Sequence, residues 1–223
     1  MSMWKSCGRI KAVVFDVDGV LVPIKSSWGY IHEKLGTVNV SQRNYRLFLE
    51  GKIGYWEWMY LDTLAWIEAF PGLTRWDLEE IVRDVEPLPE AYEVVECLKK
   101  EGYKVGLLSA GVEVVVAKVA RLLGIEYWMA PLLEFDHKGR LVPGGYPLVE
   151  VGKKHLALAR LVRRMGVGLN ETVFVGDSIW DLSAMKEACI GVAVGDVEER
   201  VAREADIYIR SLSELLDVLG LEC

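Results

Sequence analysis

Two aspartates separated by one residue follow a short apolar run near the start of the chain. Asp16 and Asp18 come directly after residues 12–15 (Ala-Val-Val-Phe), and Gly19 follows them. A short β-branched run closed by Asp-Gly is typical of a buried parallel strand. Side chains two residues apart in an extended chain point to the same side. Two carboxylates held so close together repel each other, and a bound cation or proton relieves this repulsion. The pattern therefore indicates such a site, although Asp-x-Asp-Gly also fits an ordinary turn.

A second candidate is Ser109-Ala110-Gly111, which lies between the apolar residues 104–108 and a helical pattern. A hydroxyl and free backbone N–H groups at a helix N-terminus form a ready site for an anion. A serine that only caps the helix explains the same residues.

A third candidate is the pair Lys153 and Lys154, which opens another helical pattern. The positive end of the helix dipole favours anions, so two lysines at that end oppose the usual charge preference of a helix N-terminus. This unfavourable placement suggests that an anion binds nearby. The alternative is that the two lysines are simply solvated.

The fourth candidate pair, Asp177 and Asp181, follows the apolar residues 172–176. If these carboxylates face Asp16 and Asp18, the four form an acidic site able to hold a hard cation. Mg²⁺ prefers oxygen ligands and binds through few protein carboxylates while it keeps several waters. The alternative is that Asp181 only caps the helix that follows.

These candidates need a fold that brings them together. Short apolar runs alternate with helical patterns, and residues 132–142 have the pattern of a hairpin. Strands are expected at residues 12–15, 104–109, 127–130, 172–177 and 190–194. Strands that alternate with helices predict a mainly parallel sheet, so we expect an α/β fold with a Rossmann-like three-layer core. Ligands of such sheets bind outside the carboxyl ends of the strands, where all four candidates would lie.

Residues 24–88 break the alternation, because their patterns are helical throughout. The expected helices span residues 41–50, 55–70 and 75–84. An all-helical insert after the first strand predicts a small cap of residues 24–88 beside a core of residues 1–23 and 89–223. Five of the eight tryptophans fall in the insert. They are expected to form the core of the cap, with one or two rings facing the cleft.

The composition argues against several classes of protein. The 33 acidic against 26 basic residues give a net charge of −7, which does not suit a nucleic-acid-binding surface. No apolar run approaches the ~20 residues of a membrane span, and the first nine residues lack the apolar core of a signal peptide. Four scattered cysteines (Cys7, Cys97, Cys189 and Cys223) are expected to be thiols of a cytoplasmic protein. The chain has one Gln and three Asn, a bias seen in hyperthermophile proteins.

Taken together, the four candidate segments resemble the haloacid dehalogenase-type phosphatases. Within that superfamily the chain is similar to the phosphoserine-phosphatase-like branch, which has an α-helical cap after strand one. The resemblance covers nearly the whole chain, and its motifs are residues 14–21, residues 107–111, Lys154 and residues 176–182. The order of these motifs on the predicted elements makes the resemblance specific.

The resemblance implies a Mg²⁺-dependent phosphomonoesterase that works through an aspartyl-phosphate. It makes Asp16 the nucleophile and Asp18 the general acid and base. It assigns Mg²⁺ to the carboxylates of Asp16 and Asp177 and to the backbone carbonyl of Asp18. Asp181 would support this metal site directly or by hydrogen bonding.

The resemblance also implies a site for the phosphoryl oxygens of the substrate. Ser109, Ala110 through its N–H, and Gly111 would line that site together with Lys154. Lys154 is preferred to Lys153 because it stands 23 residues before Asp177, as the lysine of the family does.

Two positions depart from the phosphoserine phosphatases, which recognise the amino and carboxylate groups of their substrate with a glutamate and a cap arginine. Lys25 stands where the glutamate is expected, and Asp62 falls on the place of the arginine. This inversion of charge makes L-phosphoserine a poor candidate, unless the cap is aligned wrongly. We expect another small phosphorylated metabolite as the substrate.

Other functions remain open at this stage. A phosphomutase would use the same carboxylates. A dehalogenase is disfavoured because its chemistry does not need Asp18, and a regulatory module without turnover is disfavoured because all the motif residues are present. The sequence leaves the oligomeric state open, a homodimer included.

Overall fold

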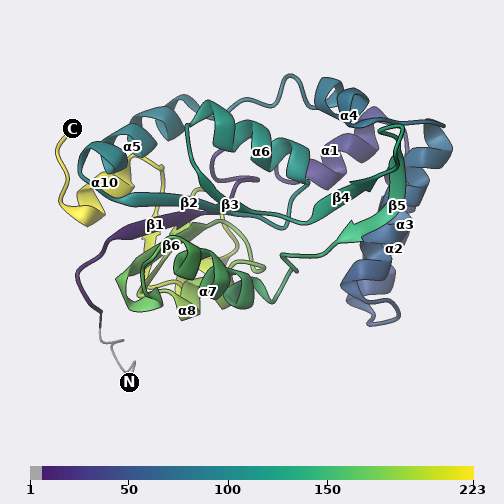
Figure 1. The fold of residues 1–223 in the computed structure, drawn as a ribbon. Helices are drawn as coiled ribbons and strands as arrows, with labels where there is room; N and C mark the ends of the chain where they lie inside the picture. The colour runs from purple at the N-terminus through teal and green to yellow at the C-terminus, as the bar shows by residue number, and fades with distance from the viewer. Residues whose placement is uncertain (1–6) are drawn as a thin grey trace.

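The computed structural model describes residues 7–223, and a six-stranded parallel sheet forms its centre (Figure 1). The order of the strands is β3-β2-β1-β6-β7-β8, and every neighbouring pair is parallel. Their bounds are β1 (Ala12–Phe15), β2 (Lys104–Leu108), β3 (Tyr127–Met129), β6 (Thr172–Gly176), β7 (Ile190–Val194) and β8 (Ile207–Ile209). All five predicted strands of the parallel sheet are present, and β8 is an additional one.

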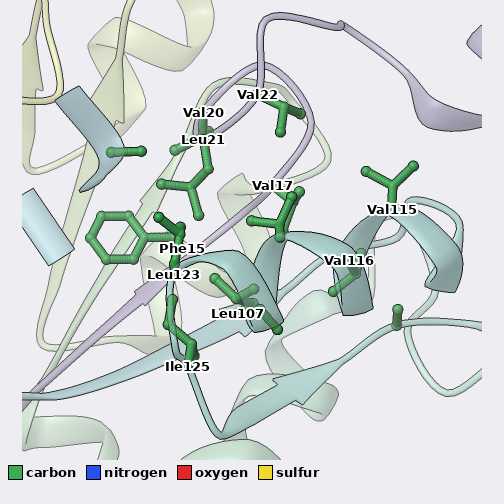
Figure 2. Packing of buried hydrophobic residues seen from close by; sticks show 14 of the residues in the cluster. Phe15, Val17, Val20, Leu21, Val22, Leu107, Val115, Val116, Leu123 and Ile125 are labelled. Atoms are coloured by element: carbon green, nitrogen blue, oxygen red, sulfur yellow. The ribbon is translucent and has the colours of Figure 1, made fainter. Parts of the chain in front are cut away.

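Helices cover both faces of the sheet, and β1 is therefore buried on both sides. Val13 and Phe15 belong to one apolar cluster, which Figure 2 shows around Phe15 and Leu107. Ala12 and Val14 belong to the other. The helices of the first face are α5 (Pro89–Lys100), α6 (Glu113–Leu122) and α10 (Glu214–Leu219). Those of the second are α7 (Lys154–Arg164), α8 (Leu182–Glu187) and α9 (Glu199–Glu204), and the short 3-10 helix η1 (Leu169–Glu171) precedes β6. The predicted three-layer α/β fold is thereby confirmed.

The segment after β1 is helical, as predicted. Its helices are α1 (Ser27–Lys34), α2 (Val38–Leu49), α3 (Tyr55–Ala69) and α4 (Arg75–Ile81). The sequence pattern did not indicate α1, which begins where the Ser26 side chain accepts a hydrogen bond from the N–H of Gly29. The apolar cluster of the first sheet face continues into this segment through Ile31, Trp66 and Leu78.

A hairpin of β4 (Leu132–Phe135) and β5 (Leu141–Tyr146) lies along α3, at the far end of the sheet from the chain termini (Figure 1). The N–H of Gly144 donates to Thr63 Oγ1 at 2.7 Å, and Trp56 Nε1 donates to the carbonyl of Gly145 at 3.1 Å. Gly145 has φ +132°, and a Cβ there would lie 2.2 Å from the Leu132 carbonyl oxygen. The hairpin therefore packs on α3 of the helical segment.

The expectation of four separate thiols is wrong, because the cysteines form two disulfides. Cys7 pairs with Cys189 and Cys97 pairs with Cys223, with Cα–Cα distances of 5.5 and 5.8 Å. The partners are 182 and 126 residues apart in the chain, so no local spacing could reveal them. Each disulfide joins a residue near one chain end to the body of the protein.

Reduction of these disulfides is expected to lower the free energy of unfolding markedly. A cross-link that closes a long loop restricts the unfolded chain, and its loss typically costs about 2–5 kcal/mol. We expect Cys97→Ser and Cys189→Ser each to lower the Tm, and the double variant to lower it by about the sum, measured by thermal unfolding. An unchanged Tm of the wild-type protein in strong reductant would contradict the expectation.

None of the helices within residues 7–223 combines the length and apolar character required to cross a bilayer.

Candidate active site

The candidate residues gather at the carboxyl edge of the sheet. Strands β2, β1 and β6 are neighbours, and Phe15 of β1 is in register with Leu107 and Val175. The residues that follow these strands therefore emerge side by side. They open into a cavity of about 510 Å³. Its lining includes seven of the predicted site residues, namely Asp16, Asp18, Ser109, Ala110, Gly111, Lys154 and Asp177.

Lys154 joins two of the carboxylates. It is the first residue of α7 and is only 2% exposed, and its Nζ lies 2.9 Å from Asp16 Oδ2 and 2.6 Å from Asp181 Oδ1. Burial disfavours the charged amine, but the charges of Asp16 and Asp181 together outweigh it and raise the pKa of Lys154. Burial raises the pKa of Asp16, against the opposing charge of Lys154. A fixed positive charge therefore sits beside the predicted nucleophile.

Asp181 is fully buried and organises the loop around it. Its Oδ2 accepts hydrogen bonds from the N–H of Asp177 at 3.2 Å, and from the N–H and Oγ of Ser178 at 3.0 and 2.8 Å. Gly176 makes this packing feasible, since a Cβ there would lie 2.5 Å from Asp181 Cγ. The side chain makes no capping hydrogen bond to α8. Asp181 thus positions Lys154 and the Asp177 loop, in place of the capping role considered as an alternative.

Asp18 is held by a residue that the sequence pattern did not single out. Asp18 Oδ2 accepts from the N–H and the Oγ of Ser27, both at 2.7 Å, and Ser27 Oγ accepts from the N–H of Val112 at 2.8 Å. Gly111 is required here because a Cβ would lie 2.6 Å from Ser27 Oγ and 2.7 Å from Asp18 Oδ2. Burial raises the pKa of Asp18, although the hydrogen bonds from Ser27 oppose the shift. A raised pKa favours a carboxyl group that can give up a proton.

The acidic residues fit a Mg²⁺ ion. Asp16, Asp177 and Asp181 each offer a carboxylate oxygen, and these three oxygens lie within 4.8 Å of one another. Asp16 Oδ1 is buried and has no hydrogen-bond partner within the part of the chain that the structure describes. Burial raises the pKa of Asp177 to about 6, with the charge of Asp181 adding to the shift and Lys25 opposing it. A buried carboxylate oxygen without a hydrogen-bond partner, such as Asp16 Oδ1, is a donor that a hard cation prefers.

Asp16 and Asp177 are better suited than Asp181 to ligate such an ion. Both oxygens of Asp181 already accept hydrogen bonds, from Lys154 and from the loop at Asp177 and Ser178. Gly19, with φ +76°, keeps the approach to Asp177 open, because a Cβ there would lie 2.2 Å from Asp177 Oδ2. The assignment of Asp16 and Asp177 as ligands, with Asp181 in support, stays a prediction.

The Ser109–Gly111 loop connects the sheet edge to the helical segment. Ser109 is 1% exposed, and its Oγ accepts a hydrogen bond from the N–H of Gly111 at 3.0 Å. The carbonyl of Ala110 accepts from Trp28 Nε1 at 3.0 Å and from the Tyr55 hydroxyl at 3.4 Å. Helix α6 begins after Val112, so Ser109 does not act as its N-cap. The Ser109 hydroxyl hydrogen remains able to point into the cavity.

The helical segment supplies the outer wall of the cavity. Of its five tryptophans, Trp28 and Trp58 line the cavity and Trp66 is fully buried, whereas Trp56 and Trp76 are exposed. Two rings therefore face the cleft, as predicted, whereas the expectation that the tryptophans form the core of the segment is wrong for Trp56 and Trp76. Lys25 and Asp62, the two positions that depart from the phosphoserine phosphatase pattern, also line the cavity.

Comparison with known proteins identifies relatives over the whole fold. A model of the haloacid dehalogenase-like hydrolases matches residues 10–188. The phosphoserine phosphatase of Methanocaldococcus jannaschii is 28% identical over 210 residues, which cover 92% of this chain and 96% of that protein. The pyrophosphatase PpaX of Halalkalibacterium halodurans is 21% identical over 231 residues, covering 96% and 99% of the two chains.

Solved structures agree with these relatives. The structure of a phospho-aspartyl intermediate analogue of phosphoserine phosphatase superposes with a TM-score of 0.75 at 26% identity, and covers 95% of this chain and 99% of that chain. A family match over more than half of the chain, together with this likeness of fold, confirms the resemblance drawn from the motifs. The chain therefore belongs to the haloacid dehalogenase-like hydrolases, in their phosphoserine-phosphatase-like branch.

Proposed function

We propose that the protein is a Mg²⁺-dependent phosphomonoesterase that transfers the phosphoryl group of a small metabolite to Asp16 and then to water. The observation that carries the proposal is the pairing of Asp16 with the buried Lys154 at 2.9 Å, in the same cavity as Asp18 and Asp177. An arrangement of this kind supplies a nucleophile, an acid–base group and positive charge around one phosphoryl group. The known phospho-aspartyl analogue of a similar protein supports the same chemistry.

The reaction divides into two half-reactions. In the first, a carboxylate oxygen of Asp16 attacks phosphorus, the ester P–O bond breaks, and the leaving oxygen takes a proton from Asp18. In the second, Asp18 takes a proton from the water that attacks the phosphorus of the aspartyl-phosphate, which restores Asp16 and releases inorganic phosphate. The carboxyl group of Asp18 therefore alternates between acid and base.

The other site residues bind and orient the phosphoryl group. Lys154 offsets the charge of the phosphoryl oxygens, while the Ser109 hydroxyl and the N–H of Ala110 donate hydrogen bonds to them. Mg²⁺ held by the carboxylates of Asp16 and Asp177 and the carbonyl of Asp18 would supply further positive charge against the negative charge that gathers there. Ser27 keeps Asp18 in place through two hydrogen bonds of 2.7 Å.

Hydrolysis of an aryl phosphate by the purified protein with Mg²⁺ tests the proposal. The expected products are the phenol and an equal amount of inorganic phosphate. A phosphomutase would instead convert a suitable substrate into an isomeric phosphoester without net release of phosphate. Absence of turnover with the aryl phosphate and with a broad panel of phosphorylated metabolites would favour a regulatory module.

Addition of Mg²⁺ is expected to raise the Tm, because a ligand that binds only the native protein stabilises it. Asp177→Asn should weaken the apparent Mg²⁺ affinity by at least about tenfold, since it replaces a ligand carboxylate, and Ser109→Ala should change it much less. Titration of Mg²⁺ followed by thermal unfolding and by activity measures both. Phosphatase activity that survives exhaustive chelation would contradict the metal assignment.

L-Phosphoserine is expected to be a poor substrate. Lys25 and Asp62 both line the cavity, with charges opposite to those that the phosphoserine phosphatase pattern places for the amino and carboxylate groups. The kcat/KM for L-phosphoserine should therefore lie well below that for the best compound in a screen of phosphorylated metabolites. The reverse ranking would show that the alignment of the helical segment is wrong.

We also propose that the protein works in the cytoplasm. Two disulfides are unusual there, but intracellular proteins of hyperthermophiles are a known exception. The scarcity of Asn and Gln, with three and one residues, points to the same kind of source.

A further inference from the structure

A buried carboxylate marks a part of the cavity that the phosphoryl chemistry does not use. Asp62 lies on α3, is 2% exposed and lines the cavity. Its Oδ1 accepts a hydrogen bond from Asn44 Nδ2 at 2.8 Å, and its Oδ2 lies 3.4 Å from His32 Nε2. Both neighbours are themselves fully buried.

The hydrogen bonds of His32 make its Nδ1 atom an acceptor. Trp66 Nε1 donates to His32 Nδ1 at 3.1 Å, and Thr37 Oγ1 lies 2.7 Å from the same nitrogen. An indole N–H is only a donor, so Nδ1 must present its lone pair and the single ring proton must be on Nε2. His32 Nε2 lies 3.4 Å from Asp62 Oδ2 and makes no hydrogen bond within the part of the chain that the structure describes. Neither Asn44 nor His32 brings a positive charge to balance the carboxylate.

The cations of the cavity are occupied elsewhere. Lys154 pairs with Asp16 and Asp181, and Lys25 Nζ lies 3.6 Å from Asp177 Oδ2. Within residues 7–223, no lysine or arginine lies within 4.0 Å of an Asp62 carboxylate oxygen. A buried carboxylate that has only neutral partners is costly, and a positive charge brought by a ligand would relieve that cost.

Aromatic rings form much of the remaining lining of the same cavity. They come from Trp28, Tyr45, Tyr55, Trp58 and Trp180. Several are fixed by mutual contacts: Trp58 lies 5.4 Å from Tyr45 and 5.9 Å from Tyr55 between ring centroids, and Trp28 stacks on Trp66 at 5.0 Å. Aromatic faces attract ammonium and alkylated ammonium groups, most strongly where water is excluded. Two further carboxylates, Asp196 and Glu198, line the cavity and add to its negative potential.

We propose that the protein selects phosphomonoesters whose alcohol carries a compact cation, an ammonium or alkylated ammonium group, which Asp62 and the aromatic walls bind. The inference rests on the proposed phosphatase function and names its substrate class. The cation would approach Asp62 while the phosphoryl group approaches Asp16 and Lys154. Esters with a carboxylate near that cation are disfavoured, because the carboxylate would enter a cavity that already holds several acidic groups.

Two matched pairs of substrates test the role of charge. Phosphocholine and 3,3-dimethylbutyl phosphate have nearly the same shape, but only the first carries a positive charge. Phosphoethanolamine and L-phosphoserine differ only in the carboxylate of the second. With Mg²⁺ and the wild-type protein, we expect kcat/KM at least tenfold higher for phosphocholine than for its neutral analogue, and higher for phosphoethanolamine than for L-phosphoserine.

Variants on one helix identify the residue responsible. Asp62→Asn should reduce the ratio of kcat/KM for phosphocholine to that for the neutral analogue to near one, and Asp62→Glu should retain part of it. Glu68→Gln removes an equal charge from an exposed position of α3 and should leave the ratio as in the wild type. Thermal unfolding of each variant shows whether it is folded.

Equal kcat/KM for the charged and neutral analogues, or a clear preference for a neutral sugar phosphate, would overturn the inference while the phosphatase function stands. Loss of hydrolysis for every ester, the aryl phosphate included, would instead count against the proposed function. In that case choline and 3,3-dimethylbutanol are compared as ligands by the shift in Tm. A shift produced by choline that exceeds the shift from the alcohol, and that is lost in Asp62→Asn, would support the cation site. Equal shifts would refute it.

Discussion

Asp16→Asn is expected to reduce phosphatase activity to background with every substrate, a loss of at least about 10³-fold. The variant removes the oxygen that would attack phosphorus, so no aspartyl-phosphate can form. It keeps the shape of the side chain, and Lys154 retains its 2.6 Å contact with Asp181. The buried centre should therefore remain folded. The measurement is release of inorganic phosphate, with a rapid-quench assay for phosphate bound to the protein.

The matched control for this variant is Asp217→Asn, at an exposed position of α10 far from the sheet edge that carries the site. It makes the same chemical change and should keep full activity. Substantial turnover by Asp16→Asn, with a Tm near that of the wild type, would show that another group is the nucleophile.

Asp18→Asn is expected to damage the two half-reactions differently. Loss of an acid–base group costs about 10²–10⁴-fold when a proton must be transferred in the transition state. Formation of the aspartyl-phosphate should therefore fall by this amount with an alkyl phosphate, whose leaving oxygen needs a proton. It should fall much less with an aryl phosphate of low leaving-group pKa. Hydrolysis of the aspartyl-phosphate should be slow with both, because the same water must be activated.

Rapid-quench burst measurements separate these two steps. The expected signature of Asp18→Asn with the aryl phosphate is a burst of phenol followed by a slow steady state. Equal damage to both half-reactions, whatever the leaving group, would refute the assigned role. Ser27→Ala is an informative companion variant, because it removes the Oγ hydrogen bond to Asp18 Oδ2 and leaves the backbone one. It should raise the pKa of Asp18 further, since a hydrogen bond to the charged form is lost.

The sequence by itself determined the sheet and the residues at its carboxyl edge. The runs before Asp16, Ser109 and Asp177 are short, apolar and closed by small or acidic residues, and these local signals are sufficient to predict parallel strands. Parallel strands in turn place the residues that follow them at one edge. Seven of the predicted site residues line the cavity there. Asp181 lies behind them and accepts a hydrogen bond from the N–H of Ser178. The roles assigned to these residues remain predictions.

Only the tertiary structure showed the contacts between distant segments. Ser27 holds Asp18 and binds the N–H of Val112, which is 85 residues further along the chain. The hairpin of β4 and β5 packs on α3, and the disulfides join cysteines 182 and 126 residues apart. Hydrophobic periodicity reports which face of one element is buried, but not which other segment covers it.

The neutral surroundings of Asp62 are likewise a feature that only the tertiary structure showed. The sequence indicated that an acidic residue replaces a basic one at this place, and nothing more. The hydrogen bonds from Asn44 to Asp62 and from Trp66 to His32 arise because α1, α2 and α3 pack together. Charge at a position can be counted from the sequence. Whether that charge is balanced depends on neighbours that only the folded chain brings within hydrogen-bond distance.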